Sequence, residues 1–311
     1  MRLVRVSNAT LSEAADRSDL ILAASGYEQR ATSAPRAVHR RVSHRVALAF
    51  QENPEALSRP DNDRILRELD YSLEPAAADN DAVPERILAE YMSAAATEHA
   101  IVIDISSMTR VWYGALVRRL LEEQRHARIT TYFVYVPGRY SAPPEDVTPN
   151  EIVAPIDGFA SLALPNLPIA LVLGLGYEPH RATALRELLD PRLTALMIPK
   201  AVSRDRFRAA VYRSNAPLIT LASRRWLFEY VLDDPSATFW LLDSIARGLE
   251  TDFRVVLASL GPKLFGLIAL ALAARRPLVS VWRASSGRSR SPREVLPDEP
   301  RTIVCRMDWE G

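Results

Sequence analysis

Ser25-Gly-Tyr-Glu-Gln-Arg-Ala-Thr32 and Leu175-Gly-Tyr-Glu-Pro-His-Arg-Ala-Thr183 are the two stretches of sequence that decide the fold of this chain. Each follows an apolar run of strand length, 19–24 in the first half and 168–173 in the second. Six of the seven residues of Gly-Tyr-Glu-Gln-Arg-Ala-Thr reappear in order, and only the glutamine is replaced, by Pro-His. The same residues at the same point of two similar patterns indicate an internal duplication.

A second pair of segments follows the first at a matched distance. It reads Asp104-Ile-Ser-Ser-Met-Thr-Arg110 in the first half and Ala258-Ser-Leu-Gly-Pro-Lys263 in the second. Its small residue, serine 107 or glycine 261, lies 81 residues after the motif glycine in the first half and 85 in the second. Each segment stands between a strand-like run and an apolar helical pattern, which supports the duplication.

Strand-like and helical patterns alternate along the chain. Strands are expected at 19–24, 45–50, 100–105, 129–136, 168–173, 193–198, 254–259 and 277–282. Helices are expected at 31–41, 84–96, 109–126, 179–189, 203–212, 235–249 and 262–274. This alternation predicts an α/β protein of two tandem Rossmann-like lobes with mainly parallel sheets, related by pseudo-two-fold symmetry. The expected boundaries are 1–140 for the N-terminal lobe, 141–165 for a linker or long loop, and 166–311 for the C-terminal lobe.

The composition is that of a globular protein with little net charge. The 311 residues include 39 basic and 38 acidic side chains, so a protein that grips a long nucleic-acid backbone is disfavoured. The single cysteine, Cys305, cannot form an internal disulfide, and it lies in an expected short strand, 302–307, where a packed thiol is expected. The N-terminus lacks the apolar run of a signal peptide, so we expect a cytoplasmic protein.

One apolar stretch, 255–274, is about long enough to cross a membrane. Gly261-Pro-Lys263 stands in its middle, where a charge is costly. Divided there, the stretch becomes a buried strand followed by a helix with proline in its first turn. We therefore expect no membrane span.

The two landmark segments have chemistry that suits an anion. In open parallel sheets, ligands bind outside the carboxyl ends of the strands, where the strand order reverses, and both landmarks lie at such ends. Ser106, Ser107 and Thr109 offer hydroxyls and helix-start N–H groups, and Arg110 adds charge. Lys263 has the same place in the second lobe, beside a glycine. No Walker sequence and no Gly-x-Gly-x-x-Gly is present, which disfavours a standard nucleoside triphosphatase or nicotinamide dehydrogenase.

These residues also have structural interpretations. The hydroxyls could be helix N-caps, which is the most frequent use of such residues. Glu28 with Arg30, and Glu178 with Arg181, could form internal ion pairs, contact a ligand, or do both.

The tyrosines and the aspartate near the strand ends also have both a structural and a functional interpretation. Tyr27 and Tyr177 either pack in the crevice or stack on a base. Asp104 either caps the following turn or acts as an acid or base, and its role is one-sided because the second lobe has Ala258 there.

No catalytic or metal-binding pattern stands out. The five histidines have no metal-ligand spacing, and each is expected at the surface or at a helix end; we expect no metal and no cofactor. Enzymatic activity is left open, with Glu28, Asp104 and Glu178 as candidate acid or base groups. The arginine-rich segments 204–213 and 283–301 are either solvated surface or contact surfaces for a partner.

The strand-end segments 103–110 and 257–263 resemble the ligand motif of CRISPR-associated Rossmann fold (CARF) sensor domains. In that family a dimer of Rossmann lobes holds a cyclic oligonucleotide across its two-fold axis, with strand-end hydroxyls and a basic residue at the phosphates. The resemblance implies a ligand role for Ser106, Ser107, Thr109, Arg110, Ser259, Gly261 and Lys263, with Ser25 and Tyr27 near the first strand end. The Gly-Tyr-Glu element is not a hallmark of that family.

Two hypotheses about function follow. The first is a sensor or regulatory component, of a prokaryotic defence system, that binds a nucleotide-like or oligonucleotide ligand in the crevice between the lobes. Its output would lie in a protein effector or in the pocket itself, and a homodimer is compatible with this hypothesis. The second is a hydrolase or transferase that acts on a nucleotide or phosphorylated substrate in the same crevice. A scaffold with a vestigial crevice is a third alternative.

Overall fold

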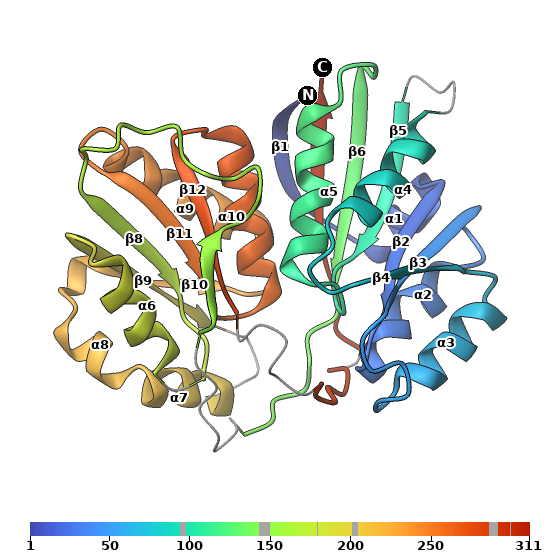
Figure 1. Ribbon diagram of the computed structural model, residues 1–311, viewed down its shortest axis with the longest axis horizontal. Coiled ribbons are helices and arrows are strands. Elements are labelled where there is room, and N and C mark those ends of the chain that lie inside the picture. Colours follow the sequence, from blue (N-terminus) through green and yellow to red (C-terminus); the bar gives the residue numbers. More distant parts are fainter. Residues whose placement is uncertain (94–97, 143–149, 179, 201–204, 286–291, 299) are drawn as a thin grey trace. The chain divides into compact units, whose positions relative to one another are not determined.

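The computed structural model describes residues 1–93, 98–142, 150–178, 180–200, 205–285, 292–298 and 300–311 (Figure 1). The chain forms two compact units: unit 1 comprises Met1–Arg139 and Pro292–Gly311, and unit 2 comprises Tyr140–Ser291. Each unit has a mainly parallel sheet interleaved with helices, so the prediction of two Rossmann-like α/β lobes is confirmed. No helix within the described ranges has the length and apolar character that a bilayer span requires.

Unit 1 is built on a seven-stranded sheet in the order β1-β13-β6-β5-β2-β3-β4. Its strands are β1 (Arg2–Ala9), β2 (Leu20–Ser25), β3 (His44–Phe50), β4 (Ser72–Ala76), β5 (Glu98–Asp104), β6 (Arg128–Tyr135) and β13 (Ile303–Glu310). Its helices are α1 (Leu11–Arg17), η1 (Gln29–Thr32), α2 (Ser33–Val38), α3 (Arg59–Glu68), α4 (Ala82–Met92) and α5 (Arg110–Glu122). Strands β2 to β6 are parallel to one another, whereas β13 is antiparallel to both β6 and β1.

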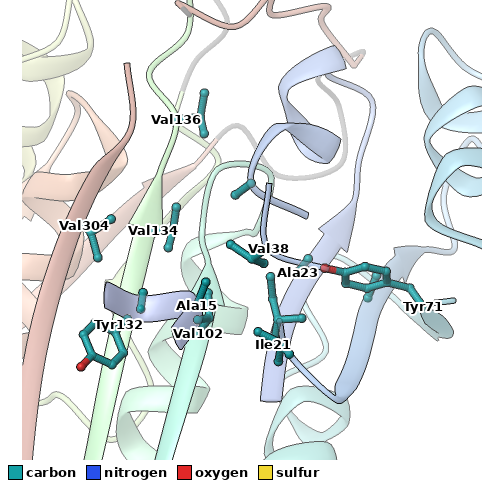
Figure 2. Close-up of a cluster of buried hydrophobic side chains, with 14 of the residues drawn as sticks. Ala15, Ile21, Ala23, Val38, Tyr71, Val102, Tyr132, Val134, Val136 and Val304 are labelled. Carbon is teal, nitrogen blue, oxygen red and sulfur yellow. The ribbon is translucent and has the colours of Figure 1, made fainter. Parts of the chain in front are cut away.

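The core of unit 1 follows from the apolar central strands. Strand β2 is buried along its whole length, as a strand covered on both faces must be. Successive side chains point to opposite faces, so Ile21 joins Val102 of β5 and Val134 of β6 in one cluster (Figure 2). Helices α1, α2 and α3 contribute buried side chains to this cluster, and Val304 of β13 completes it. Helices α4 and α5 pack against each other on the other face (Figure 1).

Unit 2 is built on a six-stranded sheet in the order β10-β9-β8-β11-β12-β7. Its strands are β7 (Ile152–Pro155), β8 (Ile169–Gly174), β9 (Leu193–Lys200), β10 (Leu227–Val231), β11 (Arg254–Ser259) and β12 (Val279–Ser285). Its helices are α6 (Arg181–Leu189), α7 (Asp205–Ser214), α8 (Ala216–Leu221), η2 (Arg224–Trp226), α9 (Pro235–Leu249) and α10 (Lys263–Arg275). Only β7 is antiparallel to its neighbour, β12. Helices α6, α7 and α8 cover one face, and α9 and α10 pack together on the other.

The two sheets have the same strand order, which supports the duplication. Strands β4-β3-β2-β5-β6 of unit 1 correspond to β10-β9-β8-β11-β12 of unit 2, and the next position is an antiparallel strand in both, β13 or β7. In sequence, β7 follows β6, and β13 follows β12. Each sheet therefore receives its antiparallel strand from the segment that follows the last parallel strand of the other sheet.

This exchange corrects the expected domain boundaries. The expected C-terminal lobe, 166–311, includes the last strand, but β13 pairs with β6 and β1 of unit 1. The expected linker, 141–165, contains β7 of unit 2, and its residues 143–149 lie outside the described residues. Sequence order alone does not reveal which sheet an antiparallel strand joins, because its partners are distant in the chain. The pseudo-two-fold relation of the lobes stays a prediction.

Several elements were not expected, among them three strands at sheet edges. Strands β1, β4 and β10 are edge strands, and β4 contains a proline, which an edge strand tolerates. Helix α3 is rich in arginine and aspartate and has few apolar side chains, Ile65 and Leu66 among them. The expected helix 31–41 is divided into η1 and α2. The start of the expected helix 203–212 lies partly outside the described residues.

Candidate functional site

The loop after β2 carries the duplicated motif at the carboxyl edge of unit 1. Asn62 of α3 donates its side-chain amide to the carbonyl oxygens of Gly26 and Glu28, both at 2.9 Å. In unit 2, Asn215 donates in the same way to the carbonyl oxygen of Gly176 at 2.8 Å. An asparagine thus holds the equivalent glycine in both units.

The glutamate and arginine of the motif form an ion pair in unit 1. Arg30 Nε lies 2.5 Å from Glu28 Oε2, and Arg30 Nη1 donates to the carbonyl oxygen of Val136, just past β6, at 2.9 Å. Arg30 is only 5% exposed. Desolvation opposes its charge, but Glu28 and Tyr135 outweigh it and raise the pKa of the guanidinium. The pair ties the first loop of the sheet to the end of its last parallel strand.

Unit 2 repeats this arrangement. Arg181 Nη1 lies 2.5 Å from Glu178 Oε2, and Arg181 Nη2 donates to the carbonyl oxygen of Ala284 in β12 at 3.2 Å. Arg181 Nε also donates to Asn150 Oδ1 at 2.8 Å. The ion-pair interpretation is therefore confirmed in both units, and contact of these residues with a ligand stays a prediction.

The serines after β5 are held by the chain itself. Asp104, at the end of β5 and fully buried, accepts hydrogen bonds from the backbone N–H of Ser106 at 2.9 Å and from its hydroxyl at 2.5 Å. The backbone N–H of Val136 donates to the same hydroxyl at 2.9 Å. Asp104 thus caps the following turn, as one of its two interpretations predicted.

The residues expected to open the two helices do so. Thr109 is the N-cap of α5, and its hydroxyl accepts from the backbone N–H of Trp112 at 3.2 Å, so its capping role is confirmed. Arg110 and Lys263 are the first residues of α5 and α10. Both side chains are partly exposed at the carboxyl edge of their sheets.

The small residues in these turns allow close contact between loops. A Cβ on Gly261 would lie 2.4 Å from the carbonyl oxygen of Leu175, and a Cβ on Gly26 would lie 2.9 Å from Cβ of Ser107. The glycine expected to admit a phosphate therefore packs against backbone. The hydroxyls of Ser107 and Ser259 are buried and have no hydrogen-bond partner within the described residues.

The remaining predicted site residues also have partners inside their own units. The buried Ser25 donates its hydroxyl to Asp63 of α3. The hydroxyl of Tyr27 donates to the carbonyl oxygen of Glu52, and burial raises the pKa of that phenol. The ring of Tyr177 packs edge-on against Phe207, with centroids 5.6 Å apart. Packing is thus the observed role of both tyrosines, and contact with a ligand base stays a prediction.

Two of the histidines are not at the surface as expected. His99 and His126 are both about 6% exposed, and their Nε2 atoms lie 3.1 Å apart. Burial first, and then the neighbouring His126, lower the pKa of His99. One nitrogen of the pair must donate and the other accept, so at least one ring is neutral.

A polar pocket of about 690 Å³ opens at the carboxyl edge of unit 1, between α2 and α3. Its polar lining comes from Gln29, Thr32, Ser33, Arg36, Ser58, Asp61, Asn62 and Arg64. Gln29 and Thr32 belong to the duplicated motif, whose buried Arg30 points elsewhere. The motif therefore presents one set of residues to the core and another to this pocket.

Most of the pocket residues were missed by sequence reasoning. Ser58, Asn62 and Arg64 lie at or on α3, a helix too polar in sequence to stand out as a core helix. Pro297 joins the lining from the far end of the chain. The repeated motif indicated the carboxyl edge of the sheet in the sequence, but it did not indicate the pocket.

No family model and no curated protein matches the sequence. Among solved structures, the cytoplasmic domain of a prokaryotic cation chloride cotransporter matches at 9% identity, with 88% of this chain and 97% of that chain covered and a TM-score of 0.26. A match at this level carries no argument about function. The description of the fold therefore rests on the strand order within each unit.

Proposed function

We propose that the protein binds a small phosphorylated ligand, nucleotide-like in its chemistry, at the carboxyl edge of unit 1. The observation that carries the proposal is the polar pocket between α2 and α3, beyond the ends of β2 and β3. Open α/β sheets bind ligands outside the carboxyl ends of their strands, and this pocket lies at that edge, beside the loops after β2 and β3. Its volume of about 690 Å³ falls in the usual range of small-molecule sites.

The lining favours an anion with several acceptor oxygens. Three hydroxyls and two side-chain amides line the pocket together with two arginines. Arg64 is shared between Asp61 at 3.3 Å and Glu68 at 2.9 Å, whereas Arg36 forms no ion pair with any described residue. Arg36 is exposed, and its Nε donates to Thr32 Oγ1 at 3.5 Å. Its guanidinium is therefore the group best placed for a two-point contact with phosphate.

The state of the candidate acids favours binding over catalysis. Glu28 and Glu178 are paired with arginines, and Asp104 caps a turn. None of the three lines the pocket. The sensor role, the protein effector and the defence context follow from the resemblance to CARF domains and belong to the same proposal.

The test is a calorimetric titration of the whole chain with inorganic phosphate, pyrophosphate, mononucleotides and cyclic oligonucleotides. We expect at least one of these to bind, and Arg36→Gln to weaken its binding about tenfold to a hundredfold, as for the loss of a charge-assisted hydrogen bond. Arg41→Gln is the matched control, because Arg41 is exposed, pairs with Asp16 at 3.1 Å and lies outside the pocket. Equal effects of the two substitutions, or no binding by any phosphorylated compound, would refute the proposal.

A further inference from the structure

A segment near the C-terminus crosses the rim of the pocket. Residues 293–298, which we call the strap, precede β13 and form part of the red coil in Figure 1. The backbone N–H of Arg139 donates to the carbonyl oxygen of Leu296 at 2.7 Å, and that of Asp298 donates to Pro137 at 2.9 Å. One end of the strap is thus fixed to the segment just past β6, and Pro297 of the strap lines the pocket.

A carboxylate holds the other end of the strap. Glu294 accepts hydrogen bonds from the backbone N–H of Gln29 at 2.7 Å and from the hydroxyl of Ser58 at 2.5 Å. Both donors belong to pocket-lining residues. The chain therefore places its own anion on two of the groups that a phosphate in this pocket would use.

From this geometry we infer that the strap is a gate in which Glu294 occupies an anion subsite of the pocket. A phosphorylated ligand takes over the Gln29 N–H and the Ser58 hydroxyl, and the carboxylate leaves. The inference rests on the proposed function for the class of ligand. The strap itself is observed independently of any ligand.

The contacts of the strap suit partial release. Glu294 is exposed, so its carboxylate can pass into water when the Gln29 and Ser58 donors are lost, while the N–H of Val295 next to it remains available at 3.1 Å. The other end packs more closely, because a Cβ on Gly138 would lie 2.2 Å from Val295 Cγ1. Displacement of Glu294 therefore leaves the strap anchored at residues 137–139 and frees only its pocket end.

The duplicated motif indicates that the gate belongs to unit 1. Gln29 is the one position of Gly-Tyr-Glu-Gln-Arg-Ala-Thr that the second copy replaces, by Pro-His. Proline has no N–H to donate, so the donor used by Glu294 has no counterpart at Pro179. The two halves thus share the Glu–Arg ion pair and differ at the residue whose N–H contacts Glu294 in unit 1.

A closed gate lowers the apparent affinity of the ligand by the fraction of molecules in which the strap is open. Removing the carboxylate should therefore tighten binding. We expect about a tenfold gain, which corresponds to one charge-assisted hydrogen bond.

The experiment compares the full-length wild type with Glu294→Ala and with Glu90→Ala, by calorimetric titration with pyrophosphate. Glu90 is an exposed residue of α4 that pairs with Arg86, so its substitution makes the same change in net charge away from the pocket. Hydrogen exchange of the pocket end of the strap, residues 293–295, is measured on the same proteins, with and without pyrophosphate, and residues 137–139 and 296–298 serve as the anchored reference. We expect tighter binding only in Glu294→Ala, and faster exchange of the pocket end of the strap in Glu294→Ala and in pyrophosphate-saturated wild type.

The outcomes separate the gate from the proposed function. Equal pyrophosphate affinity in all three proteins overturns the gate and leaves the ligand site standing. Unchanged exchange of the strap in Glu294→Ala overturns the gate without reference to any ligand. Absence of pyrophosphate binding in wild type and in Glu294→Ala overturns both, whereas binding by Glu294→Ala alone supports both.

Discussion

The substitution Trp309→Ala tests whether the last strand stabilises unit 1. Trp309 is fully buried in β13, and its indole N–H donates to Thr131 Oγ1 in β6 at 3.0 Å. Truncating a buried tryptophan to alanine costs about 3–5 kcal/mol. The lost hydrogen bond adds about 1 kcal/mol, since the hydroxyl of Thr131 keeps a second contact with Met307 at 3.4 Å. The expected loss of about 4–6 kcal/mol is a large share of the stability of a typical domain.

The loss should be confined to one unit. Hydrogen exchange followed by mass spectrometry separates peptides of β2, β5 and β6 from peptides of β8 and β11. We expect protection to fall in the first group, because β13 lies between β1 and β6 in their sheet, and to persist in the second. The matched control is Trp240→Ala in α9, where the side chain is 48% exposed and its removal should change little.

A different pattern of protection would refute this reasoning. If the last strand belonged to the second half, as the boundary 166–311 assumes, protection would fall in β8 and β11. An even fall across both units would mean that they unfold as one cooperative structure. In either case the assignment of β13 to an independently stabilised unit 1 would be wrong.

Four further substitutions test features within the units. Gly176→Ala places a Cβ 2.0 Å from a backbone oxygen and should cost about 1–3 kcal/mol or more in urea unfolding, whereas Gly248→Ala, at an exposed position of α9 with nothing within 4 Å, should stabilise by about 0.5–1 kcal/mol. Arg30→Met leaves the Glu28 carboxylate unpaired and should cost about 3 kcal/mol, at the lower end for a buried pair because that carboxylate is 21% exposed; an unchanged denaturation midpoint would contradict the structural role. The pKa of His99 is lower in the folded protein than its ordinary value of 6.5, so below pH 6.5 the unfolded chain binds more protons at this residue than the folded chain does. The contribution of neutral His99 to the free energy of unfolding is therefore complete above pH 6.5 and is lost as the pH falls toward the folded-state pKa. His99→Phe should therefore flatten the dependence of unfolding free energy on pH as the pH falls below 6.5, and an unchanged slope would contradict it.

The parallel part of both sheets could be predicted because a buried strand is recognisable from its own sequence. Runs such as the one in β2 are apolar throughout, and the helices between them are apolar on one face. The sequence of an antiparallel strand does not show which strand it pairs with. β13 pairs with β6, and two residues in contact between them, Thr130 and Asp308, are 178 residues apart in the chain. Neither strand has a sequence feature that identifies the other as its partner.

The site shows the same division between local and distant information. The repeated motif located the carboxyl edge because glycine, glutamate and arginine recur in the same order after a strand in both halves. The motif could not show that each arginine donates to a backbone carbonyl, that of Val136 or Ala284. Every residue has a backbone carbonyl, so the acceptor cannot be recognised from the sequence. The contact of the strap with the pocket rim was hidden for a related reason, since Glu294 and Ser58 are 236 residues apart.

The repeat itself acquires a different meaning from these contacts. Recurrence of Glu28 and Arg30 as Glu178 and Arg181 indicated an internal ion pair, a ligand site, or both. In both copies the ion pair forms, and the arginine ties its loop to the end of a neighbouring strand. A feature required by the shared fold is kept in both halves whether or not either half binds anything. The position that the copies do not share, Gln29, carries the N–H that faces the pocket and the strap. Function in this protein is therefore better sought where the two halves differ than where they agree, and variants at Gln29 and Ser58 are more informative about ligand binding than variants of the shared ion pair.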